Sequence, residues 1–109
     1  ALVAANLKLG NLCCIIDNNG SAAQVLPVAN QKEKWDSFGW EAREINGHSR
    51  DEFTAVFDRL TFTADDKPKA IVANTVKGKG VSFMENKLLW HYRCPDDKEY
   101  EAAKKELSI

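Results

Sequence analysis

The 109-residue chain has only three cysteines and three prolines. Three cysteines cannot all pair, and Cys13 and Cys14 are neighbours in a predicted strand, where consecutive side chains point to opposite faces. A disulfide framework is therefore not expected. Reduced thiols are typical of reducing compartments, so the expected location is cytoplasmic.

The sequence also lacks the marks of membrane, nucleic-acid-binding and zinc proteins. No apolar run approaches the ~20 residues of a membrane span. Fifteen basic and sixteen acidic residues give a formal charge of -1, so no bulk charge favours a nucleic acid or an anionic membrane. His48 and His91 stand apart and no Cys-x-x-Cys occurs, so zinc is not expected. A small ligand or a protein is the expected partner.

The chain starts on an apolar segment without an initiator methionine or a signal region, and we expect it to be a fragment of a longer protein. Its length fits one small domain, and no internal boundary is visible. Apolar periodicity and turn residues predict helices alternating with strands. The expected helices cover residues 1–9, 28–38, 49–60 and 96–107, and the expected strands cover residues 12–16, 40–45 and 70–76.

Three local signals support these helix boundaries. Gly10 stands where a left-handed stop would end the first helix. Ser49 with Glu52, and Asp96 with Glu99, have the spacing of capping boxes. Because strands alternate with helices, we predict an α/β fold with a parallel sheet flanked by helices. The strand at 12–16 is continuously apolar, which predicts that both its faces are covered.

Two glycine-containing loops, 17–21 and 77–80, follow predicted strands, and ligands of such sheets bind beyond the carboxyl ends of the strands. The first reads Asp-Asn-Asn-Gly-Ser and offers the hard oxygen ligands that magnesium prefers, although such residues are also common in ordinary turns. The second, Lys-Gly-Lys-Gly, permits a phosphate contact or a plain turn beside the site. It fits neither a P-loop nor a dinucleotide fingerprint.

Both loops lie in segments that resemble the transketolase family. Residues 8–20 read KLGNLCCIIDNNG, similar to the second half of the family's thiamine-diphosphate motif. Residues 71–86 read IVANTVKGKGVSFMEN, and with Trp90 and His91 they are similar to transketolase N-terminal subunits. The resemblance covers essentially the whole chain. It implies the C-terminal part of the diphosphate-binding domain, residues 1–109, within a thiamine-diphosphate-binding fold.

The resemblance also implies roles for three residues. Asn19 would bind magnesium through its side-chain oxygen, and Ser21 would bind it through its main-chain carbonyl. His91 would contact the diphosphate of the cofactor and the bound sugar, as a cofactor-binding and catalytic residue. The Gly-Asp-Gly half of the motif, which carries the family's aspartate ligand, does not occur in these 109 residues. A complementary chain or subunit would supply it together with the pyrimidine-binding domain.

The implied activity, within a larger assembly, is transfer of a two-carbon ketol unit between sugar phosphates with thiamine diphosphate and magnesium. Two departures from the family pattern leave alternatives open. Residues 21–24 read SAAQ where the family has an aliphatic residue and then Asp-Gly, and Tyr92 stands where the family has glycine. A sister ketolase with another sugar substrate, or a non-catalytic scaffold or docking subunit, is therefore also considered.

Overall fold

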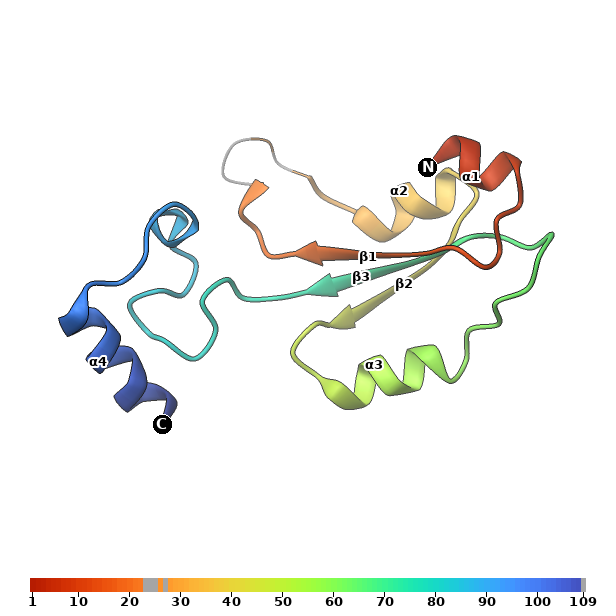
Figure 1. Cartoon of the computed structure of the whole chain (residues 1–109). Helices are drawn as coiled ribbons and strands as arrows, with labels where there is room; N and C mark the ends of the chain where they lie inside the picture. The colour runs from red at the N-terminus through yellow and green to blue at the C-terminus, as the bar shows by residue number, and fades with distance from the viewer. Residues whose placement is uncertain (23–25, 27, 109) are drawn as a thin grey trace. The chain divides into compact units, whose positions relative to one another are not determined.

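The computed structural model describes residues 1–22, 26 and 28–108 (Figure 1). The predicted order of helices and strands is confirmed, and a short 3-10 helix that was not predicted precedes the last helix. The elements are α1 (Leu2–Asn6), β1 (Cys13–Asn18), α2 (Gln31–Ser37), β2 (Glu41–Asn46), α3 (Arg50–Phe57), β3 (Lys69–Asn74), η2 (Leu88–His91) and α4 (Asp97–Leu107).

The three strands form one parallel sheet in the order β1-β3-β2. The central strand, β3, is therefore hydrogen-bonded on both sides. Its register aligns Asn18 of β1 and Asn46 of β2 with Asn74 of β3. The predicted α/β class with a parallel sheet flanked by helices is confirmed.

Helices cover both faces of this sheet, with α1 and α2 on one side and α3 on the other (Figure 1). Successive residues of a strand point to opposite faces, so neighbouring residues of β3 join different cores. Ile71 and Ala73 pack with Ile45 and Leu60, against Phe53 and Val56 of α3. On the opposite face, Ala70 packs with Trp40 and Ala42, and the partly buried side chains against them are those of Ala4, Ala5, Cys14, Ile16 and Trp35.

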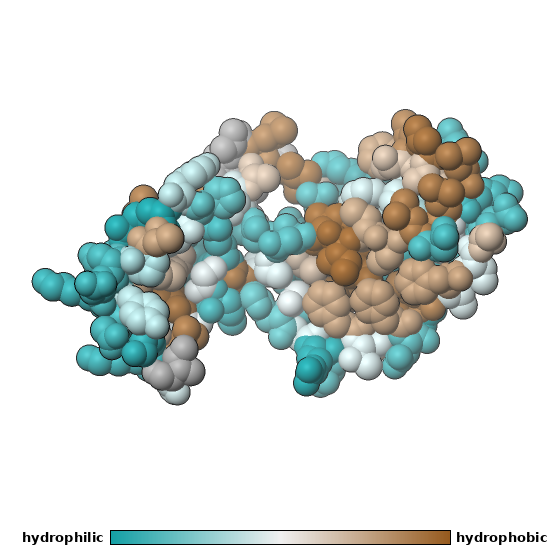
Figure 2. Space-filling view, in the orientation of Figure 1, coloured by the Kyte–Doolittle hydropathy of each residue, from teal (hydrophilic) through white to brown (hydrophobic). Residues whose placement is uncertain are grey.

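The first strand differs from its prediction in extent and in burial. It continues through Asp17 and Asn18, which pair with Ala73 and Asn74 and therefore belong to the sheet and not to the loop. Its Ile15 side chain is 54% exposed, so the strand is not covered on both faces by the described residues. β3 is the strand that combines a continuous apolar run with burial on both faces. Apolar surface is also visible over the sheet-bearing part of the chain in Figure 2.

Three helices are shorter than predicted, and one of them, α3, ends at Phe57 and not at residue 60. α1 ends at Asn6, and the left-handed residue that follows is Lys8, with φ of 49°, in place of the expected Gly10. Gly10 is required for a different reason, because a Cβ atom there would lie 2.1 Å from the Thr63 carbonyl oxygen. α2 begins at Gln31, since its N-cap Asn30 has φ of 55° and cannot continue a helix. Pro27, which directly precedes the predicted range 28–38, lies outside the described residues.

The two predicted caps take different forms. At α4 the capping box is complete, with Asp96 and Glu99 each accepting the other's backbone N–H. At α3 the Ser49 hydroxyl accepts the Glu52 N–H, but the Glu52 carboxylate accepts the backbone N–H of Asn46. That bond attaches the start of α3 to the end of β2.

The described residues divide into two compact units, although no boundary was visible in the sequence. One contains residues 1–18 and 28–74, and therefore the whole sheet. The other contains residues 19–27 and 75–109, of which 23–25, 27 and 109 are not described. The chain passes between the units directly after Asn18 and directly after Asn74.

A buried ion-pair cluster occupies the amino end of β3. The Lys69 side chain is 0% exposed, and its ammonium nitrogen lies 2.8 Å from Asp66 and 3.1 Å from Glu41 of β2. Burial opposes the charge of Lys69, but the hydrogen bonds to both carboxylates outweigh this effect and raise its pKa. The bond from Lys69 lowers the pKa of Asp66. The carboxylates are partly exposed, so the desolvation cost falls mainly on the lysine.

We expect the two sides of this cluster to respond unequally to mutation. Lys69→Met removes the buried charge and leaves two hydrated carboxylates, so it should change the melting temperature only slightly. The double variant Glu41→Gln/Asp66→Asn leaves a buried ammonium without its ion pairs, and should melt roughly 5 °C or more below Lys69→Met. Thermal unfolding followed by circular dichroism measures both.

The pH dependence provides a check on the same cluster. The raised pKa of Lys69 gives stability at neutral pH that is lost as pH rises through that pKa. The lowered pKa of Asp66 gives stability above the ordinary carboxyl range that is lost as pH falls through the lowered value. The melting difference between wild type and the double variant should therefore be flat near neutrality and shrink at both extremes. A difference independent of pH would contradict an ion-pair origin.

Candidate functional site

The carboxyl edge of the sheet carries polar side chains from all three strands. The Asn18 amide nitrogen donates to the Asn74 amide oxygen at 2.7 Å. The Asn74 amide nitrogen donates in turn to the Glu44 carboxylate at 2.7 Å. Asn46 instead accepts the backbone N–H of His48 at 3.0 Å, which stabilises the turn after β2. His48 is exposed in that turn.

Asn19 and Ser21, the two predicted magnesium ligands, lie together in the loop after β1. The Asn19 side-chain oxygen accepts the Ser21 N–H at 2.9 Å, which curls the loop. Between them Gly20 has φ of 73°, a conformation that side-chain-bearing residues rarely adopt. The Ser21 hydroxyl is buried and has no hydrogen-bond partner among the described residues.

The oxygen atoms of Asn19 and Ser21 are of the type that binds a hard divalent cation such as magnesium. An amide oxygen has two lone pairs, so accepting the Ser21 N–H does not by itself prevent the Asn19 oxygen from acting as a ligand. Magnesium usually binds proteins through a few such oxygens and takes the rest from water and phosphate. No group of three or more acidic, histidine or cysteine side chains suited to a metal occurs in the described part of the chain. The described part of the chain would therefore supply only some of the ligands of such a cation.

His91, the third predicted residue, lies at the end of η2 and is exposed. Its Nδ1 is 3.5 Å from the Lys77 ammonium, which can only donate. Of the two tautomers of a neutral imidazole, this contact suits the one with its proton on Nε2, because Nδ1 can then accept. Next to His91, the Trp90 indole donates to the Phe83 carbonyl at 3.1 Å, and the Arg93 guanidinium lies over the Trp90 ring. The histidine is therefore held on an anchored segment.

The glycines of the 77–80 loop are required by packing. Gly78 has φ of 74°, and a Cβ atom there would lie 2.8 Å from Met84. Gly80 has φ of 93°, and its N–H donates to the Glu85 carboxylate at 3.0 Å. Because that N–H is engaged within the loop, the predicted turn describes the loop better than a phosphate cradle does. From this loop, the Lys77 side chain lies beside His91, a contact that helical or strand periodicity does not indicate.

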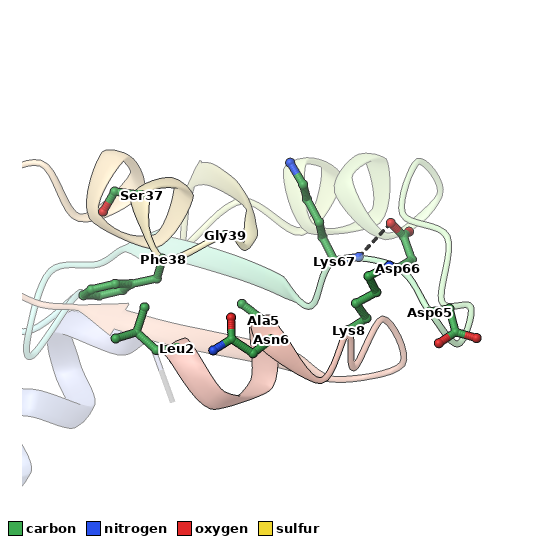
Figure 3. Close-up of a pocket in the computed structure, with 10 residues that line it drawn as sticks. All are labelled: Leu2, Ala5, Asn6, Lys8, Ser37, Phe38, Gly39, Asp65, Asp66 and Lys67. Carbon is green, nitrogen blue, oxygen red and sulfur yellow. Dashed lines mark hydrogen bonds between the residues drawn. The ribbon is translucent and has the colours of Figure 1, made fainter.

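The sheet-bearing unit also has a hollow that is lined by other residues. It is an open cavity of about 480 Å³ formed by residues that precede the strands, including Leu2, Phe38 and Lys67 (Figure 3). Figure 3 shows side chains from α1, from the end of α2 and from the loop before β3 around it. None of the predicted site residues lines it. No helix among the described residues is long and apolar enough to cross a membrane.

The chain was compared with known protein families, proteins and structures. No model of a known protein family matches the chain. An apulose-4-phosphate transketolase subunit from Phocaeicola vulgatus is 34% identical over 113 residues, which cover 99% of the chain and 40% of that protein. The 6-deoxy-6-sulfo-D-fructose transketolase subunit SqwG of a Clostridium species is 34% identical, over 98% of the chain and 40% of that protein. The chain belongs to the transketolase family.

The fold agrees with this assignment. The crystal structure of transketolase from Campylobacter jejuni matches 99% of the chain and 17% of that protein, with a TM-score of 0.78 and 23% identity. At this identity the likeness establishes the fold, which is the α/β fold of a thiamine-diphosphate-dependent family. The chain spans about 40% of the length of the two transketolase subunits named above.

The transketolase loop after β1 yields a prediction about Ser21. Ser21→Ala removes a buried hydroxyl that forms no hydrogen bond among the described residues, so no bond is lost. We expect the free energy of unfolding to stay constant or to rise by up to about 1 kcal/mol. Asn19→Ala is the matched comparison, because it removes the bond to the Ser21 N–H and should destabilise the loop. Urea unfolding measures both, and a marked loss for Ser21→Ala alone would show that the hydroxyl has a partner.

Proposed function

We propose that the chain forms the C-terminal part of the diphosphate-binding domain of a transketolase-type enzyme. In the complete assembly this enzyme transfers a two-carbon ketol unit between sugar phosphates. The curled loop after β1, which joins Asn19 to Ser21 at the carboxyl end of a parallel strand, carries the proposal. Ligands of such folds bind at this end of the sheet. Membership of the transketolase family supports it.

Each site residue has a proposed role. Asn19 binds magnesium through its side-chain oxygen, and Ser21 binds it through its main-chain carbonyl. His91 donates from Nε2 to the cofactor's diphosphate or to the sugar, with Lys77 favouring that tautomer. Bound thiamine diphosphate supplies the carbon nucleophile that carries the two-carbon unit. The residues of this chain position the cofactor and substrate and stabilise their negative charge.

A second polypeptide segment is needed to complete the site. The chain contains no Gly-Asp-Gly and spans about 40% of the related subunits, so the remaining metal ligand and the pyrimidine-binding domain come from elsewhere. Two features of the sheet-bearing unit support this partner. Ile15 of β1 is largely exposed, and Phe57 and Phe62 form an exposed stacked pair. A completing segment beside β1 would bury the exposed Ile15 side chain, and the phenylalanine pair offers further apolar surface to a partner.

Tyr92, which stands where the family has glycine, is the departure that bears on the proposed sugar substrate. Its relatives are named for apulose-4-phosphate and for 6-deoxy-6-sulfo-D-fructose, so related subunits act with different sugars. Tyr92 is 76% exposed and packs edge-on against His91, with ring centroids 4.9 Å apart. An aromatic ring beside the proposed sugar-binding histidine favours a sister ketolase with its own sugar preference.

Reconstitution tests the proposed function. The chain is combined with the polypeptide that supplies Gly-Asp-Gly and the pyrimidine-binding domain, and ketol transfer is followed with a panel of sugar phosphates. We expect transfer that requires thiamine diphosphate and magnesium. An assembled protein that binds the cofactor without transferring any ketol unit would support a scaffold or docking subunit in place of an enzyme.

The isolated chain should not bind the cofactor tightly. It offers two of the six ligand positions around magnesium and no pyrimidine pocket, so most of the binding free energy is missing. We expect a dissociation constant weaker than about 1 mM by calorimetry. Micromolar binding to residues 1–109 alone would contradict this division of the site.

Asn19 and His91 should produce different defects in the assembled enzyme. Asn19→Ala removes a metal ligand, so magnesium and cofactor affinity should fall roughly tenfold or more, and excess of both should restore much of the rate. His91→Ala should lower kcat even at saturating cofactor, because its proposed contacts extend to the reacting sugar. Rate titrations against magnesium and cofactor separate the two.

His48→Ala is the matched control for His91→Ala, because His48 is also exposed but lies in the turn after β2. It should leave kcat and cofactor affinity within about twofold of wild type. Full recovery of His91→Ala at saturating cofactor, with Asn19→Ala remaining inactive, would reverse the assigned roles.

A further inference from the structure

Two side-chain hydrogen bonds in series, here called the ladder, cross the carboxyl edge of the sheet. The ladder runs from Asn18 of β1 to Asn74 of β3 and on to Glu44 of β2, with both hydrogen bonds 2.7 Å long. Its members come from positions 56 and 30 residues apart in sequence. The parallel register brings them together, because Asn18 and Asn74 are direct partners and Glu44 lies opposite Val72.

Glu44 fixes the direction of the ladder. An ionised carboxylate can only accept hydrogen bonds, so Asn74 must turn its amide nitrogen toward Glu44. The Asn74 oxygen then faces Asn18, which donates to it. One acidic side chain on β2 therefore sets the orientation of two amides on the neighbouring strands.

The ladder lies where the two functional segments begin. β1 ends at Asn18 and β3 ends at Asn74, side by side in the sheet (Figure 1). The next residue after Asn18 is the proposed magnesium ligand Asn19. The chain after Asn74 leads to Lys77. The Asn18–Asn74 bond thus ties together the two strand ends from which these segments leave.

Asn46 lies at the same edge of the sheet but does not join the ladder. It occupies the same register row, opposite Asn74. Its side-chain oxygen, however, accepts the His48 N–H, and its backbone N–H donates to Glu52. Asn46 therefore holds its own turn and supplies a matched control for the ladder.

We propose that Asn74, oriented by Glu44, is a positioning residue for magnesium binding. It holds Asn18 at the end of β1 and so fixes the backbone from which Asn19 presents its ligand oxygen. This inference rests on the proposed function. The net contribution of one hydrogen bond corresponds to about a threefold to tenfold change in an equilibrium constant, which sets the size of the expected effect.

The test is a swap of donors and acceptors in the assembled enzyme, with magnesium binding measured by calorimetry at saturating thiamine diphosphate. Asn74→Asp replaces the donor to Glu44 by a second carboxylate, and the repulsion between the two should turn the side chain at position 74 away from its place beside Asn18, so magnesium affinity should fall roughly threefold to tenfold. An added negative charge acting through space alone would instead strengthen cation binding. The two explanations therefore predict changes of opposite sign.

The double variant Asn74→Asp/Glu44→Gln rebuilds the ladder with its net charge unchanged. The new amide at position 44 can donate to the new carboxylate, whose other oxygen can accept from Asn18. Magnesium affinity should return to within about threefold of wild type. Asn46→Ala should leave magnesium affinity unchanged, and melting temperatures of all variants are measured in parallel.

Several results would overturn the inference. If Asn74→Asp binds magnesium with wild-type affinity, the ladder has no role in magnesium binding. The same conclusion follows if the double variant binds magnesium no more tightly than Asn74→Asp. A fall in melting temperature with unchanged magnesium affinity would show a purely structural role. An assembled wild-type enzyme that binds no magnesium and thiamine diphosphate would overturn the proposed function as well, which distinguishes the two failures.

Discussion

The structure of the sheet-bearing unit depends on the burial of β3 on both faces and the hydrogen bonds along both its edges. Its residues 69–73 are all buried, and its side chains alternate between two cores. A strand in this position requires neighbours on both sides and helices on both faces, because its backbone groups and its apolar side chains both need partners. The placement of β1, β2 and α3 follows from this constraint. So does the alignment of the three strand ends.

Much of this arrangement could be predicted from sequence because its causes are local. The apolar run at 70–76 and the capping residues Ser49 and Asp96 each act within a few positions of themselves. The errors have causes that are distant in the chain. Gly10 is required by the Thr63 carbonyl, and β1 extends to Asn18 because Asn74 pairs with it. Periodicity contains no information about which strand lies beside another.

In the candidate site, too, contacts between residues close in sequence were predicted and contacts between distant residues were not. Asn19 and Ser21 were predicted from a short motif, and the structure joins them through a bond that spans two residues. Lys77 beside His91 and the ladder from Asn18 to Glu44 were not predicted, because each contact connects residues 14 or more positions apart. Their roles in cofactor binding remain proposals that the described variants test.

The two ends of β3 show how one strand can serve stability and function separately. At the amino end, Lys69 is fully buried between two carboxylates, and changing one partner disturbs a desolvated charge. At the carboxyl end, Asn74 is exposed and its bonds involve amides that solvent can also satisfy. Substitutions at the carboxyl end therefore cost the fold little. Because the proposed ligand Asn19 follows that edge directly, the proposed positioning role of Asn74 and Glu44 would allow substitutions there to change magnesium affinity while the buried sheet stays intact.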